Sequence, residues 1–338
     1  MKKMIFALAA MATLVGCSSD EVLDLHQDPI GFTDVFVDNS TRAIDNTYNS
    51  SDNKPSSFYV YGTTQDDKAN SALVSIFKHI EVNSTDNGST YSYDSDYTQY
   101  WIKDNKYKFA ALVHADQNNV KLGVDKLPKS LTFTSDSQTD LLYASTDEII
   151  GKDSGNETVG FVFNHLLSKV HVTFKNTITT NSDEVKYQYC VSDVFIDNAI
   201  QTAVCDLSSK EWTDHQSNLK VEFGHISGAE DNDDFHEAVI IEGKTAHTSN
   251  NARLLIPGKY IKENGINELT LIFTIETLIN GVVVDKNTEK LPVNVELKAG
   301  TAYNFIIEKG APGDKIEFTV NEVNEWDAPT DVPQQGNN

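Results

Sequence analysis

The 338-residue chain is predicted to fold as an all-β protein made of antiparallel sandwiches. Apolar residues alternate with polar ones in short runs, and clusters of Asp, Asn, Ser and Gly separate the runs. This spacing is typical of short strands joined by turns rather than of alternating strands and helices. Helical periodicity is not sustained and leaves only a weak trace around residues 67–80. The length is sufficient for about two such domains.

The first residues have the features of an export signal. A basic start at residues 1–3 precedes an apolar run over residues 5–15, which ends in small residues before Cys17. The run is too short to span a bilayer and is located where signal peptides occur. We therefore expect a signal peptide over residues 1–16, with acylation of Cys17 as in a lipoprotein precursor.

The following segment, residues 17–42, is expected to be a lipidated propeptide. Arg42, followed by Ala43, offers a cleavage point for an arginine-directed protease in a polar, turn-rich setting. Upstream of it, apolar residues on alternate positions, broken by Asp34, indicate one face of a strand. These residues are Ile30, Phe32 and Phe36.

An N-terminal sandwich is expected over residues 43–178. Its strand-like runs are residues 58–61 before Gly62, residues 107–109, 131–133, 159–163 and 170–174. Residues 164–168 interrupt the alternation and are expected to form one helical turn. The polar stretch 177–184 is the expected domain boundary.

A C-terminal sandwich is expected over residues 179–327, followed by a disordered tail at 328–338. Its strand-like runs are residues 187–191, 254–256, 269–275, 282–284, 291–297, 303–307 and 316–320. Turn signals separate them at Asn280-Gly281, Ala299-Gly300 and Pro312-Gly313. The Asn-Gly pair predicts a tight hairpin, because both central residues of that turn need positive φ.

The composition excludes some classes of function. A net charge of −23 would repel nucleic-acid phosphates, so no nucleic-acid partner is expected. We find no metalloprotease, nucleophile-elbow, phosphate-loop or EF-hand motif. The sequence therefore predicts a protein that is not an enzyme and that binds no cofactor or metal.

The two remaining cysteines allow two interpretations. If Asp197-Asn198 were a two-residue turn, the hairpin would pair Cys190 with Cys205 at a Cα separation of about 5.5 Å. That separation is within disulfide range, and an exported chain could oxidise the pair. A bulge in either strand would break this register and leave two free thiols.

Aromatic residues between turn signals form a candidate glycan platform at Tyr97, Tyr100 and Trp101, with Tyr91 and Tyr93 nearby. Aromatic faces beside Asp and Asn acceptors suit stacking on sugars. The alternative is that these are strand residues that face a thin sandwich core, since buried aromatic residues dominate core packing.

Motifs in order along nearly the whole chain resemble those of the fimbrillins, the pilus subunits of Bacteroidetes, also called type V pilins. The resemblance is carried by Cys17, residues 41–43, 58–62, Trp101 with 107–109, 161–170, 254–257, 300–305, 316–318 and Trp326. The acidic residues Asp20 and Glu21 after Cys17 resemble the signal that sends such lipoproteins to the outer surface.

The resemblance implies two transthyretin-like β-sandwiches in tandem. It also implies attachment of the precursor to the outer membrane through lipid, cleavage by an Arg-specific surface protease, and polymerisation with other fimbrial subunits by donor-strand exchange. The assembled fimbrium would be extracellular and would support adhesion to a host or bacterial surface ligand.

Two apolar segments suit such an exchange. We expect the propeptide strand with Ile30, Phe32 and Phe36 to fill a groove in the N-terminal sandwich until cleavage. A donor strand from a neighbouring subunit would then replace it with its own alternate residues, Ile316, Phe318 and Val320. The alternatives are that residues 316–320 are only the last strand of the C-terminal sandwich, or that the protein is a permanently anchored lipoprotein that captures glycans.

Overall fold

The computed structural model describes residues 28–38, 54–68, 71–86, 90–178, 185–224, 239–242, 246–249, 251–261 and 268–323. Strands dominate these ranges, which confirms the all-β prediction; the short turns η2 (Ser95–Tyr97) and η3 (Gln117–Asn119) are 3-10 helical. None of the helical segments found there has the length and apolar character needed to cross a membrane. The predicted signal peptide, Cys17, Arg42, Ala43 and the tail at 328–338 lie outside the described residues.

The N-terminal half forms an eight-stranded sheet with the order β2-β3-β4-β1-β10-β8-β5-β9. Because β2 also pairs with β5, the hydrogen-bonded ladder closes into a ring through β1. Its strands are β1 (Phe32–Asp38), β2 (Ser57–Gln65), β3 (Val74–Ser84), β4 (Thr90–Ser92), β5 (Lys106–Val113), β8 (Leu142–Ser145), β9 (Ile149–Ile150) and β10 (Val159–His165).

The C-terminal half is built from two larger sheets and one small one. A five-stranded sheet contains β11 (Ser168–Asn176), β15 (Ala246–Thr248), β16 (Arg253–Leu255), β21 (Ala302–Lys309) and β22 (Glu317–Val323). A seven-stranded sheet contains β6 (Val120–Leu122), β7 (Pro128–Thr134), β12 (Tyr187–Asp206), β13 (Trp212–Glu222), β14 (Val239–Glu242), β18 (Leu269–Ile279) and β19 (Val282–Val293). A two-stranded sheet pairs β17 (Gly258–Tyr260) with β20 (Val295–Leu297).

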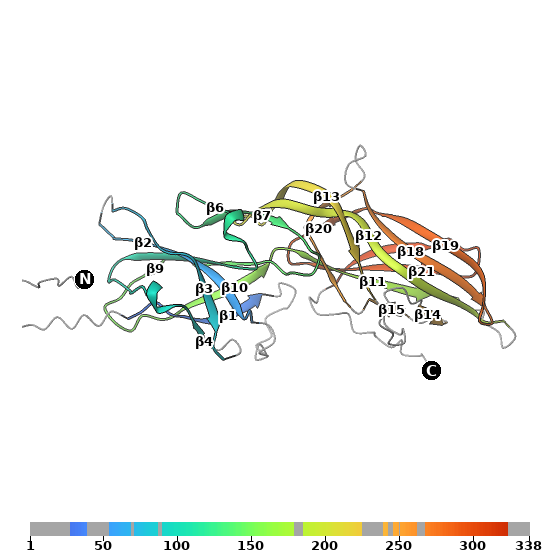
Figure 1. Ribbon diagram of the computed structural model, residues 1–338, viewed down its shortest axis with the longest axis horizontal. Helices are drawn as coiled ribbons and strands as arrows, with labels where there is room; N and C mark the ends of the chain where they lie inside the picture. Colours follow the sequence, from blue (N-terminus) through green and yellow to red (C-terminus); the bar gives the residue numbers. More distant parts are fainter. Residues whose placement is uncertain are drawn as a thin grey trace, which may run out of the picture.

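The molecule is elongated, with the two halves end to end (Figure 1). Each half has its own apolar core, and the core of the C-terminal half also takes in Leu131 and Phe133 from β7. That strand belongs to the first half of the sequence, yet it pairs with β12. The two halves are therefore joined by a shared sheet as well as by the chain.

The chain changes sheets earlier than the sequence suggested. The expected boundary was at 178/179, but β11 already pairs from Lys169 to Asn176 with β21 of the C-terminal half. No helical turn forms at 164–168: Asn164 and His165 end β10, and Ser168 begins β11. The intervening Leu166 and Leu167 are fully buried, so the crossing is a packed junction. The weak helical trace at 67–80 is also absent, since β3 begins at Val74.

The predicted hairpin at Asp197-Asn198 does not form, so the proposed disulfide is wrong. Cys190 and Cys205 lie on one continuous strand of 20 residues, β12, and both are free thiols. At about 3.3 Å per residue, the strand separates them by tens of ångströms. Asn198 does take positive φ (64°), but as part of an irregularity in the β12–β13 ladder rather than a turn.

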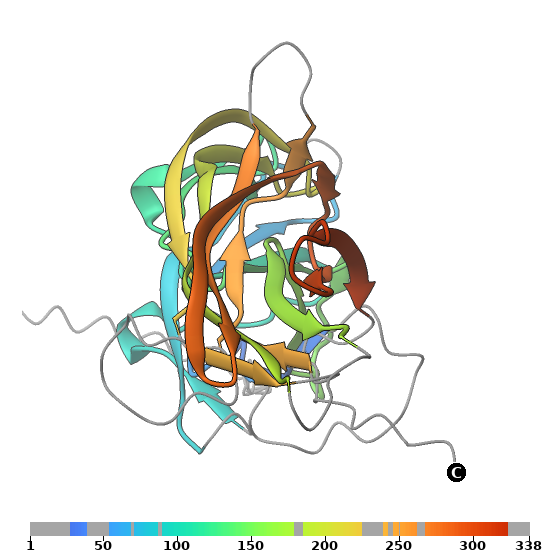
Figure 2. The same cartoon turned by 90° about the vertical axis from the view of Figure 1, so that its right-hand side faces the viewer.

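The predicted hairpin at Asn280-Gly281 is confirmed. Ile279 pairs with Val282, and the two central residues have φ values of 50° and 79°. Figure 2, which views the C-terminal half end-on, shows the last strand, β22, in dark red at one side of the molecule.

Candidate strand-exchange site

The strand β1 closes the N-terminal ring. It pairs in parallel with β10, where Val35, Phe36 and Val37 lie opposite Phe161, Val162 and Phe163, and antiparallel with β4, where Phe32 lies opposite Tyr91. Without β1, the facing edges of β4 and β10 would have no partner in the ring. An open edge above an apolar core is a ready template for another strand.

The residues that β1 buries differ in part from those expected. Ile30 and Phe32 are each 1% exposed, as their alternation predicted, but the next inward residues are Val35 and Val37. Phe36 is only partly buried, and its ring lies under the Lys54 ammonium, 5.2 Å away. The register with β10 shifts between Phe32 and Val35. Such a shift moves the following side chains to the other face. In the sequence, the break of the apolar alternation at Asp34 is the only mark of its position.

Phe32 occupies an aromatic pocket in the centre of this core. Its ring centroid lies 5.6–6.2 Å from five others: Phe58, Phe77, Tyr93, Phe109 and Phe161. Four of these contacts are edge-to-face and the Phe161 contact is stacked, which are the favourable geometries for aromatic pairs. The pocket therefore favours an aromatic residue at this point of whichever strand fills the gap.

Backbone hydrogen bonds fix the segment that enters the groove. The Ile30 amide donates to the Gln99 carbonyl at 2.8 Å, and the Trp101 amide donates to the Asp28 carbonyl at 3.0 Å. The Tyr93 hydroxyl donates to the Ile30 carbonyl at 2.7 Å. Burial raises the pKa of Tyr93, so the hydroxyl keeps its proton for this bond. These partners are mostly backbone atoms, so they would accept another strand equally well.

At the opposite end of the sequence, β22 is the edge strand of the five-stranded sheet. It pairs on one side with β21, from Ala302 opposite Val323 to Glu308 opposite Glu317. Phe318 and Val320 of this strand, and Ile316 just before it, are only partly buried against the C-terminal core. Among the described residues, the predicted donor segment therefore forms the edge strand of its own sheet.

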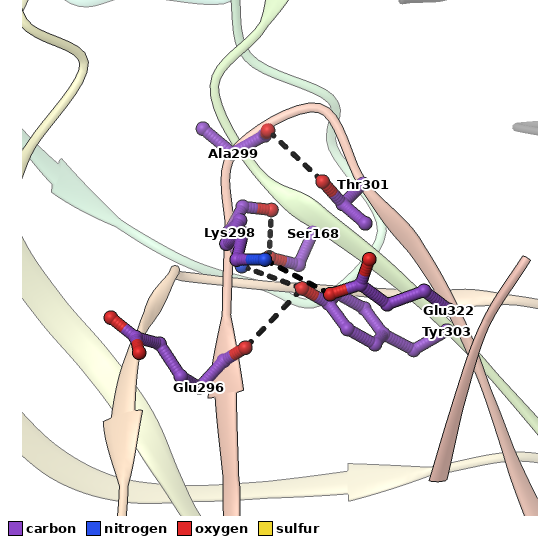
Figure 3. Close-up of polar contacts among 7 residues, drawn as sticks. All are labelled: Ser168, Glu296, Lys298, Ala299, Thr301, Tyr303 and Glu322. Carbon is purple, nitrogen blue, oxygen red and sulfur yellow. Dashed lines mark hydrogen bonds and ion pairs between the residues drawn. The ribbon is translucent and has the colours of Figure 1, made fainter. Parts of the chain in front are cut away.

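Near the C-terminal end of β22, polar contacts join the exposed Glu322 and Lys298 to the buried Tyr303 (Figure 3). The Lys298 ammonium lies 3.1 Å from the Glu322 carboxylate, and both side chains are more than half exposed. An exposed pair of this kind adds little stability. The turn beneath it is held separately, by the Ser168 hydroxyl that donates to the Lys298 carbonyl at 2.7 Å. Release of β22 would leave that turn intact.

The fold buries some residues of the candidate glycan platform and exposes the others. Trp101 is 3% exposed and packs edge-on against Tyr107 in the N-terminal core, so it cannot stack on a sugar. Tyr91 is also buried. Tyr97 and Tyr100 are about half exposed, at 49% and 47%, beside the start of β1.

Comparisons with known proteins agree with this architecture. A fimbrial protein from Bacteroides vulgatus has a similar structure, with a TM-score of 0.59 and 16% identity over 87% of this chain and 98% of its own. A protein from Bacteroides ovatus, provisionally named a cell adhesion protein, gives a TM-score of 0.50 and 16% identity over 90% of this chain and 99% of its own. No curated protein matches the sequence.

The family model for fimbrillin-like proteins matches residues 41–326. This match covers most of the chain and begins after β1, beside the predicted cleavage point. The chain therefore belongs to the fimbrillin-like family.

Proposed function

We propose that the protein is a structural subunit of a cell-surface fimbrium that supports adhesion. It is exported as a lipoprotein acylated at Cys17, cut between Arg42 and Ala43, and polymerised by donor-strand exchange with other fimbrial subunits. The observation that carries the proposal is that β1 completes the core of the N-terminal half, yet lies on the far side of Arg42 from the rest of the chain. A single cut would convert β1 from a covalent part of the domain into a separate peptide.

The free energy gained by burying apolar side chains in the groove favours such an exchange. The inward residues Ile30, Phe32, Val35 and Val37 are nearly all inaccessible to solvent. Full burial of each contributes about 1.5–3 kcal/mol, or roughly 6–12 kcal/mol for the four. This is comparable with the stability of an entire domain, about 5–15 kcal/mol. An emptied groove would therefore strongly favour a new strand, and β-strand addition would restore the ladder hydrogen bonds at the same time.

The strand β22 has the properties of a donor. Its apolar side chains are only partly buried in their own sheet, whereas the corresponding positions of the groove are almost fully buried. Its spacing of Ile316 and Phe318 equals that of Ile30 and Phe32, so Phe318 would enter the aromatic pocket that Phe32 vacates. Transfer from an edge into the groove thus increases the apolar area that the strand buries.

The relatives and the predicted export signal support a location at the cell surface. The named fimbrial and adhesion proteins are similar in fold, and the N-terminal features of this chain are those of a lipid-anchored precursor. The partners of the proposed subunit are therefore an Arg-specific surface protease, the outer membrane through lipid on the precursor, and further fimbrial subunits.

The purified precursor lacking its signal peptide provides the main test. Digestion with an arginine-specific protease is expected to create a new N-terminus at Ala43, followed by polymers visible by gel filtration and electron microscopy. Arg42→Ala should remain monomeric under the same digestion. Polymers that form equally from the uncut Arg42→Ala variant would contradict the proposal.

A second test separates the donor from the groove. Phe318→Asp is expected to fold and to be cut at Arg42, but to leave the polymerisation reaction as a monomer, because a carboxylate cannot enter the aromatic pocket. The matched control is Thr319→Asp on the exposed face of the same strand, which should polymerise. Normal assembly of Phe318→Asp would exclude β22 as the donor.

A further inference from the structure

We propose that adjacent subunits make a second, end-to-end contact, in which the tip of the β18–β19 hairpin of one copy docks on the mouth of the β1 groove of the next. The tip is defined by Val282, Val283 and Val284, and the mouth by Tyr97, Tyr100, Ile102 and Ile150. The proposal rests on the proposed head-to-tail polymer but concerns a contact outside the exchanged strand.

The tip exposes three apolar residues in succession. Val282, Val283 and Val284 are 64%, 50% and 54% exposed, directly after the Asn280-Gly281 turn. The remainder of β19 is largely charged or polar at its exposed positions, for example Lys286, which pairs with Glu276. Lysines and a proline protect the rest of this edge from pairing, so the apolar character is confined to its end.

The tip is also the end of the molecule from which β22 departs. Ile279 of the hairpin pairs with Tyr187, and the Tyr189 hydroxyl donates a hydrogen bond to the Gly310 carbonyl. The turn that leads into β22 begins at Gly310 and includes Gly313, whose φ of 91° only glycine adopts easily. A β22 strand that swings outward about this turn would leave the molecule beside the three valines.

The mouth lies at the opposite end of the molecule and exposes aromatic and aliphatic side chains. Tyr97, Tyr100, Ile102 and Ile150 are each 46–49% exposed. Tyr100 forms a backbone bridge with Pro29, just before β1, and Ile150 pairs with Lys106 at the outer end of β5. In Figure 1, β9, which contains Ile150, is at the left end and the β18–β19 hairpin extends to the right end.

The direction of β1 links the two ends. It starts at the mouth with Phe32 opposite Val159 and runs inward to Asp38 opposite Asn164, near the junction of the two halves. A donor that leaves the tip of one copy and runs in the same direction enters the next copy at its mouth, with Ile316 first and Phe318 two residues further on. The short connection from Gly310 to Ile316 then holds the tip valines against the mouth.

This arrangement joins two different surfaces of identical subunits. A head-to-tail contact of that kind does not close on itself and therefore extends into a filament. Apolar patches that are exposed on a monomer typically mark interaction sites, which suits both surfaces. The contact would fix the angle between neighbouring subunits, which a single exchanged strand leaves variable.

The test is a disulfide placed across the proposed contact. A chain carrying both Val283→Cys and Tyr100→Cys is cut with arginine-specific protease, allowed to polymerise, and oxidised with copper phenanthroline. We expect a ladder of covalent multimers on a non-reducing denaturing gel. The matched control carries Val283→Cys with Thr213→Cys, an exposed position on β13 in the middle of the molecule, and should give no ladder. The native Cys190 and Cys205 are buried and should not interfere.

A charge at the tip gives a kinetic readout. Val283→Asp should slow polymer growth by about tenfold, the factor expected for losing the burial of one valine, while Thr213→Asp should leave growth unchanged. Polymers that form without the 283–100 cross-link would overturn the contact and leave strand exchange standing. If such polymers also bind a glycan array through Tyr97 and Tyr100, the mouth is a sugar platform instead. Failure of every variant and of the unsubstituted chain to polymerise would overturn the proposed function and this contact together.

Discussion

Truncation of the residue at the centre of the groove measures how strongly β1 is held. In Phe32→Ala, the pocket formed by five aromatic rings loses its occupant while the strand keeps its backbone ladder. We expect the uncut precursor to fold, with a less stable N-terminal half and faster release of β1 after cleavage at Arg42.

The magnitude follows from the burial of the ring. Phe→Ala at a position that is 1% exposed costs about 3–5 kcal/mol, through lost transfer energy and the cavity that remains. Aromatic pairs add roughly 0.5–1.5 kcal/mol beyond area, but five pairs around one ring are not additive, so the upper part of the range is the expected result.

The same strand offers a matched control. In Phe36→Ala, a ring of the same size is lost from a partly exposed position, together with its contact to the Lys54 ammonium. That contact contributes about 0.5–1 kcal/mol at an exposed site, so the total loss should stay well below that of Phe32→Ala. Urea unfolding followed by tyrosine and tryptophan fluorescence measures both. Equal losses in the two variants would refute the inward assignment of Phe32 and the outward assignment of Phe36.

Three further predictions concern residues outside β1. Cys190 and Cys205 should react with a thiol reagent only after denaturation, because burial raises the pKa of both thiols, that of Cys205 to about 12, and a non-reducing gel should show no mobility shift that reduction abolishes. Burial lowers the pKa of His171 to about 4, so the neutral ring is favoured in the folded state; stability should be constant above the unfolded pKa of about 6.5 and fall as the pH decreases from there toward 4. The His171→Leu variant should lack this part of the slope, and an identical slope in both proteins would contradict the assignment. Trp101→Ala should destabilise the N-terminal half by about 3–5 kcal/mol, whereas Tyr100→Ala should change the unfolding midpoint little, as two urea titrations would show.

Local patterns were sufficient for many of the strands and for the turn at Asn280-Gly281. The alternation of Val159, Phe161 and Phe163 predicted β10, and all three side chains are buried. Asn280-Gly281 predicted a hairpin because the positive φ values of that turn depend on the two residues themselves. Strand alternation and turn conformation depend on a few neighbouring residues, so they can be predicted directly from the sequence.

The candidate site was predictable in part. Alternating apolar residues pointed to residues 30–36 and 316–320, the resemblance to fimbrillins suggested their exchange, and Ile30 and Phe32 are indeed buried in the N-terminal core. Val35 and Val37 were missed because the register shift that turns them inward arises from pairing with β10, more than a hundred residues away in the sequence. In the sequence, the three consecutive valines Val282 to Val284 predicted only an ordinary strand. Their exposure depends on the position of β19 at the edge of its sheet, which the sequence does not show.

By itself, the sequence determined that this chain is all-β and located the centres of many of its strands. It also showed which strand-like segments lie near the predicted cleavage point and near the C-terminal end of the sequence. Only the tertiary structure decided which strands pair. Asp197-Asn198 has the residues of a turn, but β13 and β18 pair along the two edges of β12 and hold it in one extended strand. In the same way, β1 closes a ring and β7 joins the second sheet, because pairing across a sheet depends on strands that are distant in sequence, whereas alternation and turn chemistry depend on neighbours.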